Sequence, residues 1–287
     1  MFGMKTSQLA DTVDEARDAL SAAGASPPQI LMLLGTGSRT LAGSLQSRRS
    51  IDLGSIGVLP DAWREQELFS GTLAGARVWM LEDSPLDPLD ERATSPDWVR
   101  PLPVWLAAAS GATVCVHTSA GITLNPDSLA VGSIALVKDH LNLSGRSPLR
   151  GIGESRLGPL FPDQSRVHHP GLRSRARRAG QERGIATHEA VVACTMGPNQ
   201  TTPAELQWCA STGADIVVQE LAAPLIACAH AGLATLSLVA ITDSGSEPLR
   251  LQEIVERSEA AAPALEDLVL ACAGDFKEVA DELEEVL

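Results

Sequence analysis

The sequence predicts an α/β protein, with residues 1–287 forming a single domain in which helices flank a central mixed, largely parallel β-sheet. Short apolar runs of strand length recur along the chain. Most of them are continuously apolar, which is typical of strands buried on both faces of a sheet, and longer helical patterns lie between them. The runs are 29–35, 76–81, 112–118, 132–137, 189–195, 214–219 and 233–242.

The segments between these runs predict the helices. They are 8–23, 101–110, 170–183, 203–211, 222–231, 250–270 and an acidic amphipathic segment at 275–287. The helix from Pro203 has the clearest start, because Thr202 is a favoured N-cap residue and proline suits the first helical position. Two long stretches, 82–100 and 143–166, predict loops. Loops of that length in a compact domain are usually functional or mobile.

Charge and composition exclude several classes of function. The chain has 22 Lys and Arg against 36 Asp and Glu, a formal net charge of −14, so a nucleic acid would approach against its field. No stretch reaches the roughly 20 uncharged apolar residues that a membrane span requires, and the first residues lack the apolar segment of a signal peptide. We therefore expect a cytoplasmic protein that binds neither nucleic acid nor membranes.

The cysteines predict reduced, buried thiols. They are odd in number, widely spaced and placed in apolar segments rather than in CxxC pairs. They are Cys115, Cys194, Cys209, Cys228 and Cys272.

Four loops that follow predicted strands carry small and polar residues. The first is "GTGS" (35–38), whose backbone N–H groups and hydroxyls can cradle an anion. It fits neither GxGxxG nor the Walker pattern, and a plain strand-to-helix turn explains it equally well. The others begin at Ser119, at Thr195 and at Ala240. Ligands of open α/β sheets bind outside the carboxyl ends of strands, so we expect a site where these loops converge.

Taken in order, several of these segments resemble one family. They are "GTGS", "TSAGITLNPDSLAVGSIALVKDHLNLSGRSPLRG", "GPLFPDQS", "MGPNQTTPAE", "GADIVVQELAAPLIACAHAGL" and "LVAITDSG", and they resemble the trimeric purine nucleoside phosphorylases and methylthioadenosine phosphorylases over roughly 30–244. The resemblance implies a homotrimer that cleaves the N-glycosidic bond of a purine nucleoside with inorganic phosphate. The products are a free base and ribose 1-phosphate, and no metal or other cofactor is implied.

The resemblance also implies residue roles at the sugar and phosphate. Thr36 falls where the family places a hydroxyl on phosphate. Ser119 and Ala120 line the sugar and phosphate site, with Ser119 standing where the phosphorylases for 6-oxopurines have Asn. Gln219 takes the place of a Met that packs against the sugar.

At the base, Thr201 replaces a base-binding Glu and Asp243 replaces an Asn. A hydroxyl residue paired with Asp resembles the methylthioadenosine branch, which reads 6-aminopurines. A carboxylate accepts a hydrogen bond from an exocyclic amine or shares a proton with N7, and either helps a purine leave as a neutral base. We take Asp243 and Ser119 as the candidate catalytic residues.

The phosphate site departs furthest from the family. Asp83 stands near the expected Arg, Pro85 near the expected His, and Glu220 where a Ser or Thr binds phosphate. Two unit charges about 4 Å apart interact by roughly 4 kcal/mol at an effective dielectric of about 20. Two carboxylates facing a phosphate dianion therefore repel it unless a cation intervenes or they become protonated.

Two arrangements of this site remain open. In the first, Asp83 and Glu220 face the pocket and weaken phosphate binding. In the second, the "EDSPLD" loop swings outward, Asp83 is solvated and an arginine fills the vacancy. The candidate arginines, each also compatible with a solvated surface charge, are Arg39, Arg92 and Arg100.

The histidines and a basic segment have alternative interpretations. His168 and His169 stand near a family aromatic, where a substrate-facing role and a packing role are both open. His140 and His230 are interpreted as packing residues. The segment 173–178 has the spacing of a basic, solvent-facing helix surface.

Three functions remain at this stage. The first is phosphorolysis of a purine nucleoside. The second is a protein that kept the fold and binds a nucleoside or base without phosphorolysis. The third is a nucleoside hydrolase, in which Asp83 or Glu220 activates water. Phosphate dependence of base release separates them.

Overall fold

The computed structural model describes residues 8–35, 39–83, 95–153 and 155–285. Thr36, Pro85 and Arg92 lie outside these residues, as does the side chain of Arg39. Within the described residues the helices are α1 (Gln8–Ala22), α2 (Leu102–Ala109), α3 (Pro170–Arg183), α4 (Pro203–Ser211), α5 (Ala222–Ala231), α6 (Leu251–Ala271) and α7 (Ala273–Glu284). Short 3-10 turns form at Arg39–Ser44, Leu53–Ser55 and Asp61–Trp63.

The strands form one sheet of nine strands in the order β2-β3-β4-β1-β5-β8-β7-β6-β9. They are β1 (Ile30–Leu34), β2 (Gln46–Asp52), β3 (Glu67–Leu73), β4 (Ala76–Glu82), β5 (Val114–Thr123), β6 (Ile134–Asn142), β7 (Thr187–Thr195), β8 (Ile216–Gln219) and β9 (Ala234–Asp243). Strand β5 also pairs with β9. The strands β5, β8, β7, β6 and β9 therefore close on themselves, while β2, β3, β4 and β1 extend the sheet to one side.

The sheet is mixed, as the sequence predicts. Strands β4, β1, β5 and β9 are parallel neighbours, and β6, β7 and β8 are parallel to one another. The two groups run in opposite directions, because β8 meets β5 and β6 meets β9 in antiparallel pairs. Strand β3 is antiparallel to both β2 and β4. The strands β2 and β3 were not predicted, because β2 is mostly exposed and polar and β3 alternates instead of forming a continuous apolar run.

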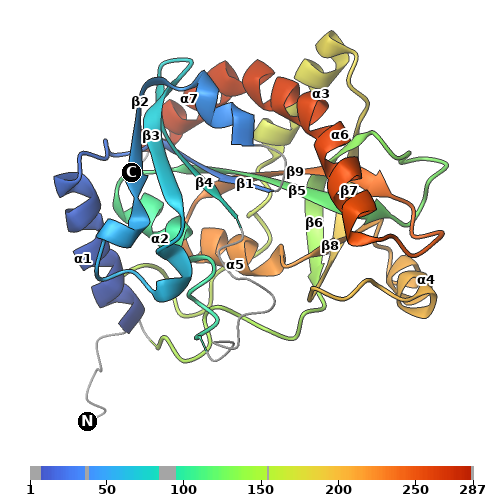
Figure 1. Cartoon of the computed structure of the whole chain (residues 1–287), viewed down its shortest axis with the longest axis horizontal. Coiled ribbons are helices and arrows are strands. Elements are labelled where there is room, and N and C mark those ends of the chain that lie inside the picture. The colour runs from blue at the N-terminus through green and yellow to red at the C-terminus, as the bar shows by residue number, and fades with distance from the viewer. Residues whose placement is uncertain (1–7, 36–38, 84–94, 154, 286–287) are drawn as a thin grey trace.

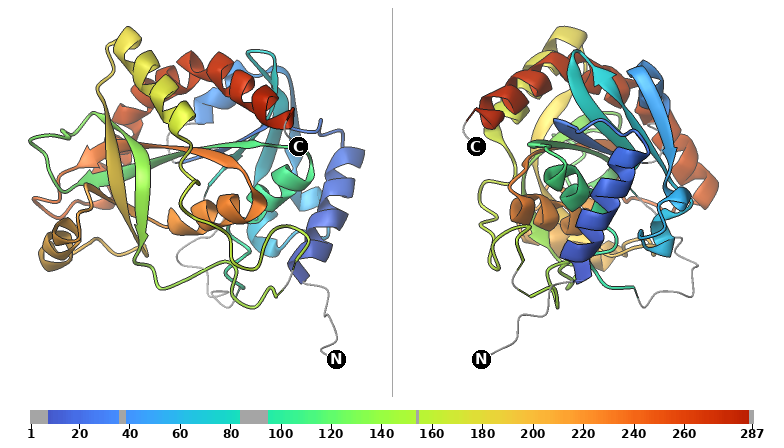
Figure 2. Two further views of the ribbon diagram at one scale, coloured as in Figure 1. Left: turned by 180° about the vertical axis from the view of Figure 1, so that it is seen from behind. Right: turned by 90° about the vertical axis from the view of Figure 1, so that its left-hand side faces the viewer.

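The sheet is buried on both faces, which explains its continuously apolar strands. In β1 every residue is buried: Leu31 and Leu33 face one core, whereas Ile30, Met32 and Leu34 face the other. Helices α1, α2 and α5 cover the first core and α3, α6 and α7 cover the second (Figures 1 and 2). The helical segments expected from the sequence all form within a few residues of their predicted bounds.

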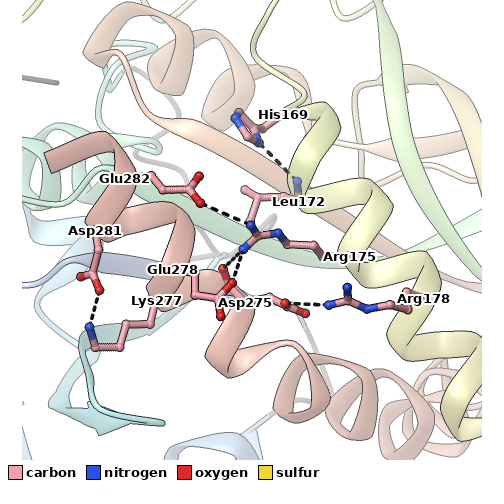
Figure 3. A network of polar contacts seen from close by, with 9 residues as sticks. All are labelled: His169, Leu172, Arg175, Arg178, Asp275, Lys277, Glu278, Asp281 and Glu282. Carbon is pink, nitrogen blue, oxygen red and sulfur yellow. Dashed lines mark hydrogen bonds and ion pairs between the residues drawn. The ribbon is translucent and has the colours of Figure 1, made fainter. Parts of the chain in front are cut away.

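Ion pairs join the basic face of α3 to the acidic helix α7 (Figure 3). Arg178 lies 2.9 Å from Asp275, and Arg175 lies 3.0 Å from Glu278 and 3.4 Å from Glu282. Such exposed pairs contribute about 0–1 kcal/mol each. The basic segment at 173–178 is therefore a helix surface neutralised by its neighbour.

The histidines near α3 and α5 have structural partners. Nδ1 of His169 accepts a hydrogen bond from the backbone N–H of Leu172 at 3.2 Å, and so caps α3. Nδ1 of His140 lies 3.1 Å from Nε2 of His168, and burial lowers the pKa of His168 to about 3. Nδ1 of His230 accepts a hydrogen bond from the indole N–H of Trp105 at 2.9 Å.

The five cysteines are all buried and unpaired. In the described part of the chain, no three His, Cys, Asp or Glu side chains are grouped as metal ligands. No helix there has the length and apolar character needed to cross a membrane.

Gly35 is required where β1 approaches β5. A Cβ atom on Gly35 would lie 2.7 Å from the carbonyl oxygen of Thr118, and the Gly35 N–H donates to Oγ1 of Thr118 at 2.9 Å. We expect Gly35→Ala to lower the free energy of unfolding by about 1–3 kcal/mol, because backbone must move to admit the methyl group. Chemical denaturation measures this. Gly43→Ala is the control, since nothing lies within 4 Å of its added Cβ, and an equal loss in both variants would contradict the packing argument.

Candidate functional site

The mixed topology brings the carboxyl ends of β1, β4, β7 and β8 together beside the middle of β5. Strands β1 and β4 end beside the middle of β5, at Gly35 and Asp83. The second half of β5 pairs with β8 in antiparallel fashion, with Ile122 opposite Val217. Beyond Val217 the chain runs back along β5 toward Ser119, and Thr195 of β7 pairs with Gln219 of β8. Two of the stretches predicted as loops are strand instead, because β5 continues through Ser119 to Thr123 and β9 continues through Ala240 to Asp243. Residues 36–38 of the predicted "GTGS" loop lie outside the described residues. The strand ends meet although β7 and β8 run opposite to β5.

Asp83 is held at the end of β4 by its neighbours on β1 and β5. Its backbone N–H donates to the carbonyl of Leu34 at 2.9 Å, and its Oδ2 lies 2.8 Å from Nε2 of His117. The Asp83 side chain is 14% exposed. Burial on its own raises the pKa of Asp83, but the charge and hydrogen bond of His117, together with Arg100, outweigh it, so the pKa lies below its usual value. Asp83 is therefore ionised at neutral pH.

Arg100 bridges Asp83 and Glu220. Its Nη2 lies 3.5 Å from Oδ2 of Asp83 and its Nη1 lies 2.9 Å from Oε2 of Glu220. Asp83 is therefore not a solvated residue of an outward loop, and Arg100 reaches the predicted phosphate site. It does so paired to both carboxylates. We call Asp83, Arg100, His117 and Glu220 the Arg100 cluster.

Glu220 is fixed by backbone contacts as well as by Arg100. Its N–H donates to the carbonyl of Thr195 at 2.8 Å, and its Oε1 accepts from the N–H of Gly197 at 3.2 Å. Its φ of 63° lies in the left-handed region, which costs a residue with a Cβ on the order of 1 kcal/mol. The surrounding contacts hold the carboxylate in place against this cost.

Three buried polar atoms in and beside the Arg100 cluster have no hydrogen-bond partner among the described residues. They are Nε of Arg100, Nδ1 of His117 and Oγ1 of Thr195. Buried polar groups are normally hydrogen-bonded, so the cluster retains hydrogen-bonding capacity for a water or a ligand.

A pocket of about 70 Å³ adjoins the cluster. Arg100 and Glu220 form part of its wall, with residues from 95–97, from 144–148 and from the first turn of α5. Its second arginine, Arg146, lies 3.7 Å from Asp97. Both guanidinium groups of the pocket are thus paired with carboxylates.

Ser119, Ala120 and Gln219 lie between the Arg100 cluster and the end of β9. Ser119 and Ala120 are partly exposed on β5, opposite Val239 and Ala240 of β9. The Gln219 side chain donates to the carbonyl of Asn199 at 2.7 Å, so it is tied to the loop that follows β7.

The loop that carries Thr201 and the loop that follows Asp243 are joined to each other. The side chain of Gln200 hydrogen-bonds to both backbone groups of Leu249, at 2.5 Å and 2.9 Å. Asp243 ends β9 and is 8% exposed. Its Oδ1 accepts from the N–H of Ser244 at 2.8 Å and from Nη1 of Arg257 at 3.0 Å. Thr201 is half-buried, just before the capping residue of α4.

Two charged partners were missed from the sequence. His117 lies two residues before Ser119 in a run read only as a strand, and its pairing with Asp83 links separate strands. Arg257 lies inside α6 with no local motif, and its contact with Asp243 depends on how that helix packs on β9.

The pairing of Asp83 predicts a pH-dependent stability. Because the pKa of Asp83 is lowered on folding, its charge stabilises the fold above about pH 4, and this contribution is lost as the pH falls through the lowered value. We expect Asp83→Asn to be less stable than the wild type by about 1–3 kcal/mol at pH 7. The difference should shrink between pH 4 and pH 2, as followed by urea denaturation.

Asp127→Asn, which neutralises an exposed carboxylate, is the control, and we expect it to stay within about 0.5 kcal/mol of the wild type at pH 7. A constant difference between Asp83→Asn and the wild type over this pH range would contradict the pairing.

Comparison with known proteins identifies the family of the chain and shows relatives with the same fold. Residues 63–273 match the model of the phosphorylase superfamily. Purine nucleoside phosphorylase 1 of Geobacillus stearothermophilus is 28% identical over 254 residues, which cover 86% of this chain and 91% of that protein. The purine nucleoside phosphorylase of Bos taurus is also 28% identical, over 258 residues, covering 84% of this chain and 87% of the relative.

Solved structures share the fold. A schistosoma purine nucleoside phosphorylase in complex with hypoxanthine superposes with a TM-score of 0.84 at 21% identity, covering 94% of this chain and 99% of that one. Isoform 2 of the Schistosoma mansoni enzyme, in complex with cytosine and ribose-1-phosphate, has a TM-score of 0.83 at 22% identity, with 92% and 96% coverage. The chain therefore belongs to the phosphorylase superfamily, and its distant relatives are purine nucleoside phosphorylases.

Proposed function

We propose that the protein cleaves the N-glycosidic bond of a purine nucleoside with phosphate, giving a free base and ribose 1-phosphate. The observation that carries the proposal is the match to purine nucleoside phosphorylases along 84–86% of the chain. Solved relatives have been seen with hypoxanthine, adenosine, inosine and guanosine, which supports a purine or its nucleoside as the ligand.

The proposed roles follow the resemblance to the phosphorylase family. Ser119 and Ala120 contact the sugar and phosphate, and Gln219 lies beside the sugar. Thr201 and Asp243 bind the base. As the glycosidic bond breaks, negative charge develops on the purine, and a proton shared between Asp243 and N7 allows the base to leave neutral. Thr36, from its place in the sequence, supplies a hydroxyl to phosphate.

Phosphate itself meets an unfavourable charge. Asp83 and Glu220 carry two negative charges against the one positive charge of Arg100, and Arg100 is bound to both. A phosphate dianion therefore gains little from Arg100 unless one carboxylate releases it. We expect weak phosphate binding, with Asp83 and Glu220 as the residues that set it.

The same cluster supports a second candidate. A carboxylate paired with an imidazole, as in Asp83 and His117, is a typical general-base arrangement. Hydrolysis of the nucleoside by a water at the Arg100 cluster needs no anion, and binding of a nucleoside or base without cleavage needs none either.

We further propose a cytoplasmic homotrimer without a metal or other cofactor, and with neither nucleic acid nor membrane as a partner.

A nucleoside panel assayed with and without phosphate tests the function. We expect chromatography to detect base release from a purine nucleoside that depends on phosphate and has a high KM for it, because the cluster repels the anion. Release independent of phosphate would instead establish the hydrolase. Binding of the nucleoside without release would establish the protein that only binds.

Removing the two carboxylates tests the charge argument. The double variant Asp83→Asn, Glu220→Ser frees Arg100 and removes two like charges, each contact being worth on the order of 1–4 kcal/mol. We expect calorimetry to show phosphate affinity rising at least about tenfold, which corresponds to about 1.4 kcal/mol.

The control for this titration is Asp61→Asn, Glu67→Gln, which removes the same charge from two exposed positions. Tight phosphate binding by the wild type, or no gain specific to the first double variant, would contradict the argument.

A further inference from the structure

The two oxygens of the Asp243 carboxylate have different surroundings. Oδ1 accepts two hydrogen bonds, from the backbone N–H of Ser244 at 2.8 Å and from Arg257 at 3.0 Å. Oδ2 accepts none from the described residues. A carboxylate oxygen offers two lone-pair sites, so Oδ1 is fully used and the remaining capacity of Asp243 lies on Oδ2.

Arg257 is anchored so that it can fix this orientation. It lies in the second turn of α6, and the same Nη1 that contacts Asp243 lies 3.4 Å from the carbonyl oxygen of Thr242. Its side chain is 43% exposed, whereas that of Asp243 is 11% exposed. The guanidinium therefore holds the carboxylate from the solvent side. Its Nη1 contacts both the Asp243 side chain and the Thr242 backbone at the end of β9.

We propose that Arg257 is a positioning residue that sets base specificity by orienting the side chain at position 243. This inference rests on the proposed function, in which Asp243 meets the purine. Because two donors occupy Oδ1, the atom that reaches Oδ2 must itself be a donor. An exocyclic 6-amino group or a protonated N7 satisfies Oδ2, whereas a 6-oxo group presents a second acceptor to it.

The same geometry determines what an amide would do at position 243. In Asp243→Asn the amide nitrogen cannot accept from Arg257 and Ser244, so the amide oxygen takes the place of Oδ1. The NH₂ group then takes the place of Oδ2 and offers a donor to the ligand. With Arg257 in place, replacing one carboxylate oxygen by an NH₂ group therefore reverses the direction of the hydrogen bond to the base.

Calorimetric titration of adenine and of hypoxanthine tests this inference. We expect the wild type to prefer adenine by about tenfold or more, as a hydrogen bond to a charged group implies, and Asp243→Asn to prefer hypoxanthine. Arg257→Met keeps the length of the side chain without its donors. It should reduce the preference severalfold in both the wild-type and the Asp243→Asn backgrounds, because only the Ser244 N–H then orients the side chain.

Two further variants separate orientation from general disruption. Arg257→Lys restores one donor and should recover part of the preference. Arg178→Met removes a comparably exposed arginine from its pair with Asp275, and should leave the adenine to hypoxanthine ratio unchanged. Thermal melting of each variant confirms that it is folded.

The outcomes separate the two proposals. If both bases bind and the ratio is the same in folded Arg257→Met as in the wild type, the role of Arg257 is overturned while the proposed function stands. If Arg257→Met does not fold, Arg257→Lys takes its place in the test. The same conclusion then follows if the folded Arg257→Lys has an unchanged adenine to hypoxanthine ratio with either Asp or Asn at position 243. If neither base nor any purine nucleoside binds the wild type, the proposed function is overturned and this inference falls with it.

Discussion

The contact on which the rest of the site depends is the bridge from Arg100 to Asp83 and Glu220. Two carboxylates that meet in a partly buried site repel each other, and a cation between them offsets this repulsion. The bridge joins the end of β4, the end of β8 and the segment before α2, which are far apart in the sequence. It also fixes Glu220 in a left-handed backbone conformation. The carboxyl end of the sheet is thus built around one arginine.

This arrangement alters the chemistry that the fold supports. A phosphate site needs positive charge that is free to meet an anion, and here the positive charge is already neutralised by the protein's own carboxylates. A second arginine and carboxylate pair, Arg257 and Asp243, lies where we propose that the base binds. In both places an arginine is paired with carboxylates: Arg100 bridges Asp83 and Glu220, and Arg257 leaves one oxygen of Asp243 available to a ligand. An arginine paired with carboxylate therefore organises each end of the proposed site.

Much of the fold could be predicted from the sequence, because its signals are local. A continuous apolar run such as Ile30–Leu34 is buried on both faces and is recognisable by itself. Thr202 and Pro203 are adjacent residues that mark the start of α4, and the structure contains the expected cap at Thr202. Strand β2 could not be predicted, because its backbone pairs with β3 while its side chains are mostly exposed and polar.

The site was only partly predictable for the opposite reason. Asp83 and Glu220 stand out as departures from a family pattern, but whether Arg100 reaches them depends on the packing of a loop before α2. His117 and Arg257 give no local signal, since each gains its role from a partner on another element.

The central claim is that the protein's own carboxylates hold the arginine which a phosphate would need. A crystal structure of the wild type grown with a purine nucleoside and a high concentration of phosphate tests this most directly. We predict that Arg100 remains on both Asp83 and Glu220, with no phosphate bound to its guanidinium group. An ordered phosphate on Arg100, with Glu220 turned away from it, would contradict the account.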